Sequence, residues 1–231
     1  MAVRYAIYFV PAAETDIYRF GRSILGYDCY TGEDVRAAEL ADADGWRSLT
    51  EEPRRYGFHA TLKAPFRLLP SCTEAQLTSA VFGLAELVHP VPRIDPEIRL
   101  IKSFAAIVPR ETPPSLHELA DRCTMMFDPY RAPMSVAEHA RRVAAGLTLT
   151  EMQNLERWGY PYVFGDFRFH ITLTGAIAAD RRAAVHRDLL RIFAETCRSQ
   201  SIAVDRIALL RQDDEQARFR VICQAKLGCG R

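Results

Sequence analysis

The chain has 231 residues and is 48% hydrophobic, enough apolar material for one generous domain or two small ones. Its 30 basic and 29 acidic residues give a formal net charge of +1, which disfavours a long polyanion held mainly by charge. No apolar run approaches the ~20 residues that span a bilayer, and the N-terminus lacks the uninterrupted apolar core of a signal peptide.

The six cysteines stand in no C-x-x-C pair and in no zinc-binding spacing. This usage is typical of reduced thiols in a reducing compartment. We therefore expect a cytoplasmic protein with no membrane partner, and the sequence leaves its oligomeric state open.

In the first half of the chain, apolar periodicity predicts strands and helices around one long loop. Thr73 and Gln76 have the spacing of a capping box, and Pro90 and Pro92 end the helix that Thr73 begins. Trp46 and Leu49 are candidate anchors that would order part of the loop. The predicted elements are a strand at 3–10, a helix at 14–25, an irregular loop at 27–55, a strand at 56–69, a helix at 73–88, and either two short strands at 97–101 and 104–108 or one bulged strand.

The second half is predicted to begin with helices and to end with a hairpin. Gly159-Tyr160-Pro161-Tyr162 is expected to be a turn before the next strand. The predicted elements are helices at 115–127, 135–145 and 150–158, a strand at 167–177, a helix at 180–198, hairpin strands at 202–210 and 218–225, and a loose tail at 228–231.

One pentapeptide pattern occurs twice, close to half the chain length apart. Residues 58–62 and 169–173 both read Phe-His-x-Thr-Leu. A Thr two residues after a His is weak evidence alone, but the matching Phe and Leu make coincidence improbable. Two core histidines on duplicated strands are the structural alternative. The other histidines, at 89, 117, 139 and 186, lack the pattern.

Each motif strand is followed by a helix and then by two strands, which predicts two similar lobes. We expect an α+β fold that is bilobal, with pseudo-two-fold symmetry and two mostly antiparallel sheets facing a central cleft, helices covering their outer faces. The lobe with the first motif is expected at roughly 1–112 and the second at roughly 113–231, within a single domain whose lobes are free to exchange strands. Whether the loop at 27–55 covers the cleft is not decided by the sequence.

Alternation along a strand predicts which side chains share the cleft face. Each copy offers an imidazole, a hydroxyl two residues on, and a cation. One neutral imidazole can take a proton from an attacking oxygen while a charged one protonates the leaving oxygen. The threonine hydroxyls can bind phosphate oxygens, and this chemistry requires no metal or cofactor. The expected residues are His59, Thr61 and Lys63 in the first copy and Arg168, His170, Thr172 and Thr174 in the second.

Several aromatic side chains are secondary candidates. Tyr5 or Tyr8 reaches the cleft, depending on which way the first strand faces. Tyr56, Tyr162 and Arg211 are possible contacts at its rim.

Paired His-x-Thr-hydrophobic motifs resemble those of the two-histidine (2H), LigT-like phosphoesterase superfamily. The stretches RYAIYFVP at 4–11, YGFHATLKAPF at 56–66 and GYPY at 159–162 are similar to the branch associated with phosphonate metabolism and carbon–phosphorus lyase systems. The resemblance implies a bilobal fold and a metal-independent cyclic phosphodiesterase. His59 and His170 would then be acid and base, and Thr61 and Thr172 would hold phosphate. It also makes 5-phosphoribosyl 1,2-cyclic phosphate a candidate substrate.

Two other functions stay open on the sequence. One is an RNA 2′,3′-cyclic phosphodiesterase or ligase-like enzyme, which the near-neutral charge disfavours, although Arg141-Arg142 and Arg181-Arg182 are candidate basic patches. The other is a protein that binds a phosphorylated ligand without turnover. A binder needs no second histidine, so the repeated motif favours the enzyme. The expected partner is a small phosphorylated substrate rather than nucleic acid, and which histidine is the acid is not decided.

Overall fold

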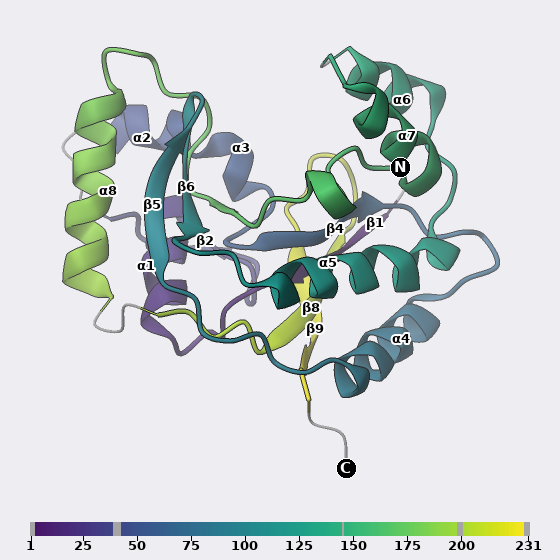
Figure 1. Ribbon diagram of the computed structural model, residues 1–231. Coiled ribbons are helices and arrows are strands. Elements are labelled where there is room, and N and C mark those ends of the chain that lie inside the picture. Colours follow the sequence, from purple (N-terminus) through teal and green to yellow (C-terminus); the bar gives the residue numbers. More distant parts are fainter. Residues whose placement is uncertain (1–2, 39–42, 145, 198–200, 229–231) are drawn as a thin grey trace.

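The computed structural model describes residues 3–38, 43–144, 146–197 and 201–228 and has a mixed α+β architecture (Figure 1). Seven antiparallel strands form one sheet in the order β5-β6-β7-β4-β1-β8-β9, and β2 and β3 form a small second sheet. The strands are β1 Arg4–Phe9, β2 Tyr27–Asp28, β3 Glu33–Asp34, β4 Ala60–Phe66, β5 Pro96–Ile101, β6 Phe104–Pro109, β7 Ile171–Thr172, β8 Arg206–Gln212 and β9 Arg220–Lys226.

Helices pack against the large sheet and against each other. In Figure 1, α8 lies beside β5, α4 lies near β8 and β9, and α6 and α7 stand apart from the sheet. The α-helices are α1 Asp16–Leu25, α2 Ala43–Leu49, α3 Glu51–Arg54, α4 Glu74–Leu87, α5 Pro114–Phe127, α6 Val136–Val143, α7 Leu149–Trp158 and α8 Arg182–Thr196, with 3-10 turns η1 Asp128–Tyr130 and η2 Phe164–Asp166. No helix in the described part of the chain is both long enough and apolar enough to cross a membrane.

The predicted helix boundaries follow from their caps. The hydroxyl of Thr73 accepts from the backbone N–H of Gln76, and the Gln76 side chain accepts from the backbone of Thr73, which confirms the predicted capping box of α4. The left-handed conformation of Gly26 ends α1. Predictions for residues 39–42, 145 and 198 and for the tail at 229–231 lie outside the described residues.

The predicted α+β class is confirmed, but the two expected sheets are one. β4 and β7, which carry the two motifs, pair directly through Ala60 and Ile171. Strands of the two chain halves also interleave, because β5 and β6 extend the sheet beyond β7 while β8 and β9 extend it beyond β1. The motif strands therefore lie side by side near the middle of one sheet.

β7 is much shorter than the strand predicted at 167–177. After Thr172 the backbone N–H groups of Leu173 and Thr174 both donate to the carbonyl of Ala105, at 2.9 and 3.3 Å. Regular pairing cannot continue when two successive N–H groups share one acceptor, so the ladder ends there.

The segment 27–55 was predicted to be an irregular loop, and this was wrong. It contains β2, β3, α2 and α3. Trp46 is buried, and its indole N–H donates to the carbonyl of Ile24 at the end of α1, 2.8 Å away. The short helices have no repeating apolar stripe, so one buried anchor orders them without a periodic signal.

Candidate active site

A cleft lies on one face of the large sheet, around the two motif strands. One cavity of about 470 Å³ is lined by His59, Thr61 and Thr172. A neighbouring cavity, also of about 470 Å³, is lined by His170 and again by Thr61. The two cavities share Thr61, Phe104 and Tyr160 in their walls, so they adjoin.

Strand pairing brings the two motifs together. Ala60 and Ile171 are paired and fully buried. Continued by one residue in each direction, this antiparallel register sets His59 opposite Thr172 and Thr61 opposite His170. These four side chains are all half-buried, as expected if they share the face opposite to Ala60 and Ile171.

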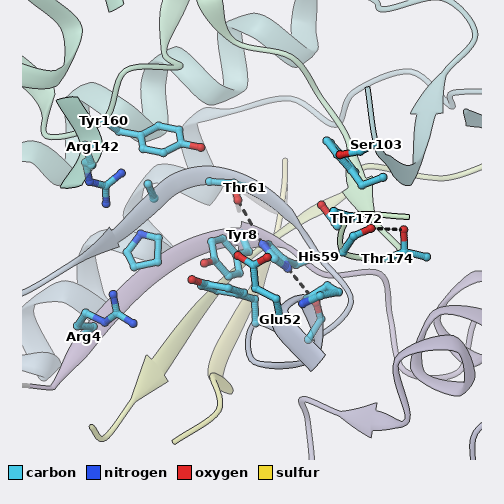
Figure 2. Close-up of a pocket in the computed structure, with 18 residues that line it drawn as sticks. Arg4, Tyr8, Glu52, His59, Thr61, Ser103, Arg142, Tyr160, Thr172 and Thr174 are labelled. Carbon is cyan, nitrogen blue, oxygen red and sulfur yellow. Dashed lines mark hydrogen bonds between the residues drawn. The ribbon is translucent and has the colours of Figure 1, made fainter. Parts of the chain in front are cut away.

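Both histidine rings are oriented in the same way. Nδ1 of His59 lies 2.9 Å from the carbonyl oxygen of Gly57, and Nδ1 of His170 lies 2.9 Å from that of Arg168. In each copy the partner is therefore the carbonyl two residues earlier. A carbonyl can only accept, so Nδ1–H donates and Nε2 is left for chemistry. Nε2 of His59 lies 3.2 Å from Oγ1 of Thr61 (Figure 2).

The surroundings of His59 keep its ring neutral. Tyr8 of β1 stacks on it, with ring centroids 3.8 Å apart, and Tyr56 lies 6.0 Å away. The pKa of His59 is lowered to about 4, chiefly by burial and in smaller part by the nearby His170, while the hydrogen bond to the Gly57 carbonyl opposes the shift. At neutral pH the ring is therefore neutral, and its Nε2 is able to accept a proton.

Two glycines allow the first motif to sit where it does. Gly57 has φ +76°, and a Cβ there would also lie 2.6 Å from Cβ of Cys29. A Cβ on Gly21 of α1 would lie 2.1 Å from the ring of Phe58. Phe58 thus packs directly onto the α1 backbone, beneath the sheet face that carries His59.

Some of the predicted site residues line the cleft, and others lie elsewhere. Tyr8 lines the cleft, whereas Tyr5 points to the opposite face, where its hydroxyl donates to Glu74 of α4 at 2.8 Å. Tyr162 and Arg168 line the His170 cavity. The Arg168 guanidinium donates to two nearby backbone carbonyls, 2.6 and 2.8 Å away. Thr174 reaches the His59 cavity but is buried, with its hydroxyl bonded to backbone groups of Ala105 and Gly175.

Lys63 does not share the cleft face, contrary to the prediction. β4 has an irregularity here, since Tyr8 pairs with Thr61 but Ile7 pairs with Lys63, which leaves Leu62 as an extra residue. Such a bulge breaks the simple alternation. Lys63 is buried, and its ammonium donates to Asp128 and to a backbone carbonyl of α5, both at 3.0 Å. Arg211, a predicted rim contact, pairs instead with Glu74 and Asp213.

Several residues of the cleft wall were not among the predicted site residues. Arg4 lies four residues before Tyr8 on β1, so alternation from Tyr8 gives a signal for it. Arg142 and Tyr160 come from the region of α6 and α7, and α3 contributes Glu52; no local pattern marks these. In the part of the chain that the structure describes, no group of three or more His, Cys, Asp or Glu side chains could hold a metal ion.

Comparisons with known proteins identify relatives. The family model described as "Protein of unknown function (DUF1045)" matches residues 61–220. A curated protein of Janthinobacterium sp. (strain Marseille), named ribose 1,5-bisphosphate phosphokinase PhnN, is 33% identical over 94% of this chain and 49% of its own length. A protein of the same name from Laribacter hongkongensis (strain HLHK9) is 31% identical over 76% of this chain and 40% of its own.

The chain thus spans about half the length of the curated relatives it matches, or less. A solved structure described as "Crystal structure of phosphoesterase" is 14% identical, covering 97% of this chain and 98% of that one, with a TM-score of 0.41. That likeness is too low to assign a shared fold.

Proposed function

The chain belongs to the DUF1045 family. We propose that its cleft is the active site of a metal-independent phosphodiesterase of the 2H type, which acts on a small cyclic phosphate ester. The observation that carries the proposal is the pair of histidines on adjacent strands. Both turn Nδ1 to a carbonyl, and each lies across from a threonine of the other motif.

The two histidines are suited to opposite proton transfers. His59, neutral because of its burial, takes a proton from a water molecule as the water oxygen bonds to phosphorus. His170, entering as imidazolium, gives its proton to the ring oxygen as the bond from phosphorus to that oxygen breaks. The products are a phosphate monoester and a hydroxyl. Each transfer typically contributes ~10²–10⁴-fold to the rate.

The threonines are placed to bind the phosphate. Thr61 lies beside Nε2 of His59, and Thr172 lines the same cavity. Their hydroxyls can donate to the non-bridging oxygens, whose negative charge increases as water attacks. When product leaves, His59 releases its extra proton to solvent and His170 takes up a proton from solvent, which restores both starting states.

The names of the relatives support a candidate substrate, 5-phosphoribosyl 1,2-cyclic phosphate. Those proteins are named for a kinase of ribose 1,5-bisphosphate. Hydrolysis of the 1,2-cyclic ester between phosphorus and O2 leaves the phosphate on O1 and yields ribose 1,5-bisphosphate. The proposed product is therefore the compound in the relatives' name. A place in phosphonate catabolism is proposed from the resemblance of residues 4–11, 56–66 and 159–162 to the branch associated with that metabolism.

Alanine variants of the motif histidines test the proposal. We expect His59→Ala and His170→Ala each to lower kcat for the cyclic ester at least ~10²-fold, because each removes one proton transfer. His89→Ala is the matched control, since His89 is exposed and lies outside the cleft. Phosphorus NMR reads the conversion of cyclic diester to monoester.

Three outcomes would contradict the proposal. Turnover that survives both changes would remove the histidines from the chemistry. Loss of activity with a chelator would indicate a metal enzyme. Calorimetry that shows tight binding of cyclic phosphate with no product would indicate a binding protein.

A further inference from the structure

The His59 cavity has a basic end that the proton-transfer chemistry does not use. Arg4 and Arg142 both line it, and one carboxylate, that of Glu52, is among its lining residues. Figure 2 shows the two arginines on one side of the cavity and Thr172, Thr174 and Ser103 on the other. We propose that Arg4 and Arg142 form a second anion subsite, which holds a terminal phosphate monoester of the substrate while the cyclic phosphate lies at the histidines.

Arg4 is oriented by neutral groups. Its Nε donates to Oε1 of Gln212 at 2.8 Å, and its guanidinium lies 5.7 Å from the ring centroid of Phe219. Gln212 is buried and is itself fixed by a 2.7 Å bond to the carbonyl of Ala217. Gln212 and Phe219 therefore hold the side chain of Arg4 in place. Because no carboxylate among the described residues pairs with Arg4, its charge and its terminal N–H groups remain available for an anion.

Arg142 approaches the cavity from α6. One terminal nitrogen donates to Glu138 at 3.1 Å, and Glu138 also lies 3.9 Å from Arg67, so a single carboxylate faces two guanidinium groups. Nε of Arg142 is buried and has no hydrogen-bond partner within the described part of the chain. A buried donor without a partner is costly, and a bound phosphate oxygen would relieve that cost. The guanidinium is steadied by the Tyr160 ring, 5.4 Å away.

The spacing suits one small ligand with two anionic ends. Tyr8 stacks on His59, and Arg4 precedes Tyr8 by four residues on the same strand. At ~3.3 Å per residue, the Cα atoms of Arg4 and Tyr8 are roughly 13 Å apart. The long side chain of Arg4 covers part of this span. A lone cyclic phosphate would reach only the histidines, whereas a phosphorylated pentose would also reach Arg4. This inference rests on the proposed function and narrows its substrate class to cyclic phosphates with a terminal phosphate.

Two matched substrates test the subsite. We expect wild-type protein to prefer 5-phosphoribosyl 1,2-cyclic phosphate to ribose 1,2-cyclic phosphate, which lacks only the terminal phosphate. Arg4→Gln and Arg142→Gln should each lower the ratio of the two kcat/KM values by about 10- to 100-fold, the effect of one charged hydrogen bond. Arg191→Gln is the control, since Arg191 pairs with Glu195 on the surface of α8. A wild-type ratio near one, or a ratio unaffected by both substitutions, overturns the inference and leaves the proposed function standing.

Binding of ribose 5-phosphate gives a readout that does not depend on turnover. In a His59→Ala/His170→Ala double variant, calorimetry should detect this monoester, and adding Arg4→Gln or Arg142→Gln should weaken its affinity by about 10-fold or more. If wild type turns over neither cyclic ester, the proposed function fails, and the same titration still decides the subsite. If ribose 5-phosphate binds equally well with and without the two arginines, the proposed subsite is overturned. Thermal unfolding of each variant verifies that the fold is retained.

Discussion

Two nearly identical pentapeptides hold histidines in different surroundings. His59 is covered by Tyr8, which comes from β1, and burial lowers its pKa to about 4. His170 has Phe104 as its ring neighbour, with centroids 6.2 Å apart. The motif thus predicts the type and spacing of the residues, while burial beneath Tyr8 of β1 lowers the pKa of the first histidine.

The lowered pKa of His59 predicts a pH-dependent stability. Between about pH 6.5 and about pH 4 the unfolded chain binds a proton at residue 59 that the folded chain does not. The free energy of unfolding should therefore fall as the pH drops through this range, by on the order of 2 kcal/mol after allowance for partial exposure. His59→Asn, which removes the titrating group, should reduce that fall. Urea denaturation at pH 7 and pH 4.5 measures it.

His89→Asn is the control, because His89 is exposed. The free energy of unfolding of the His89→Asn variant should change with pH as that of the wild type does. Parallel pH curves for His59→Asn and wild type would show that the ring is not held neutral by burial.

At the scale of single elements, the alternation rule worked where the strand is regular and failed where it is not. It predicts a common face for His59, Thr61, His170 and Thr172, and the pairing of Ala60 with Ile171 agrees with that. It misplaces Lys63, because the bulge in β4 adds a residue between Thr61 and Lys63. A bulge leaves no signal in this stretch of sequence.

The two helices between residues 43 and 54 were also missed because the sequence carries no local signal for them. They are short and carry no apolar stripe, so long-range packing of Trp46 orders them rather than local periodicity. Arg142 of α6 and Tyr160, which follows α7, line the cleft although they lie far from His59 in the sequence. Local patterns therefore predicted the central strands and the long helices, and missed the walls of the cleft.

The bulge sends Lys63 into a buried ion pair that joins β4 to α5 and η1. Asp128 accepts from Lys63 at 3.0 Å and from Arg131 at 2.8 Å. Burial lowers the pKa of Lys63 to about 8. Asp128→Ala leaves this ammonium buried without its partner and should cost about 3–5 kcal/mol in the free energy of unfolding.

Lys63→Met is the comparison, since it removes the charge and keeps an apolar chain of similar length. It should cost less than Asp128→Ala in urea denaturation. It should also retain cyclic phosphate turnover within a few fold, because Lys63 lies outside the cleft. A loss of turnover as large as that of His59→Ala would place Lys63 among the phosphate-binding groups after all.

At the scale of the whole molecule, neither half of the chain contains a complete cleft. β7 lies between β6 and β4, and β8 lies beside β1, so each half supplies strands to the sheet of the other. His59 and Arg4 come from the first half, and His170 and Arg142 come from the second. The cleft exists only where both halves are assembled.

A break in the chain near residue 112 tests this interdependence. Residues 111 and 112 are exposed and lie between β6 and α5, so a cut there spares every strand and helix. Without its partner, the piece 1–112 loses β8 from the edge of β1 and exposes apolar side chains such as Ile7, now fully buried. We expect each piece alone to lack a cooperative unfolding transition in circular dichroism. Mixed or co-expressed pieces should recover both the transition and the cyclic phosphate turnover. Either piece folding alone would show instead that the lobes are independent domains whose strands merely meet at the cleft.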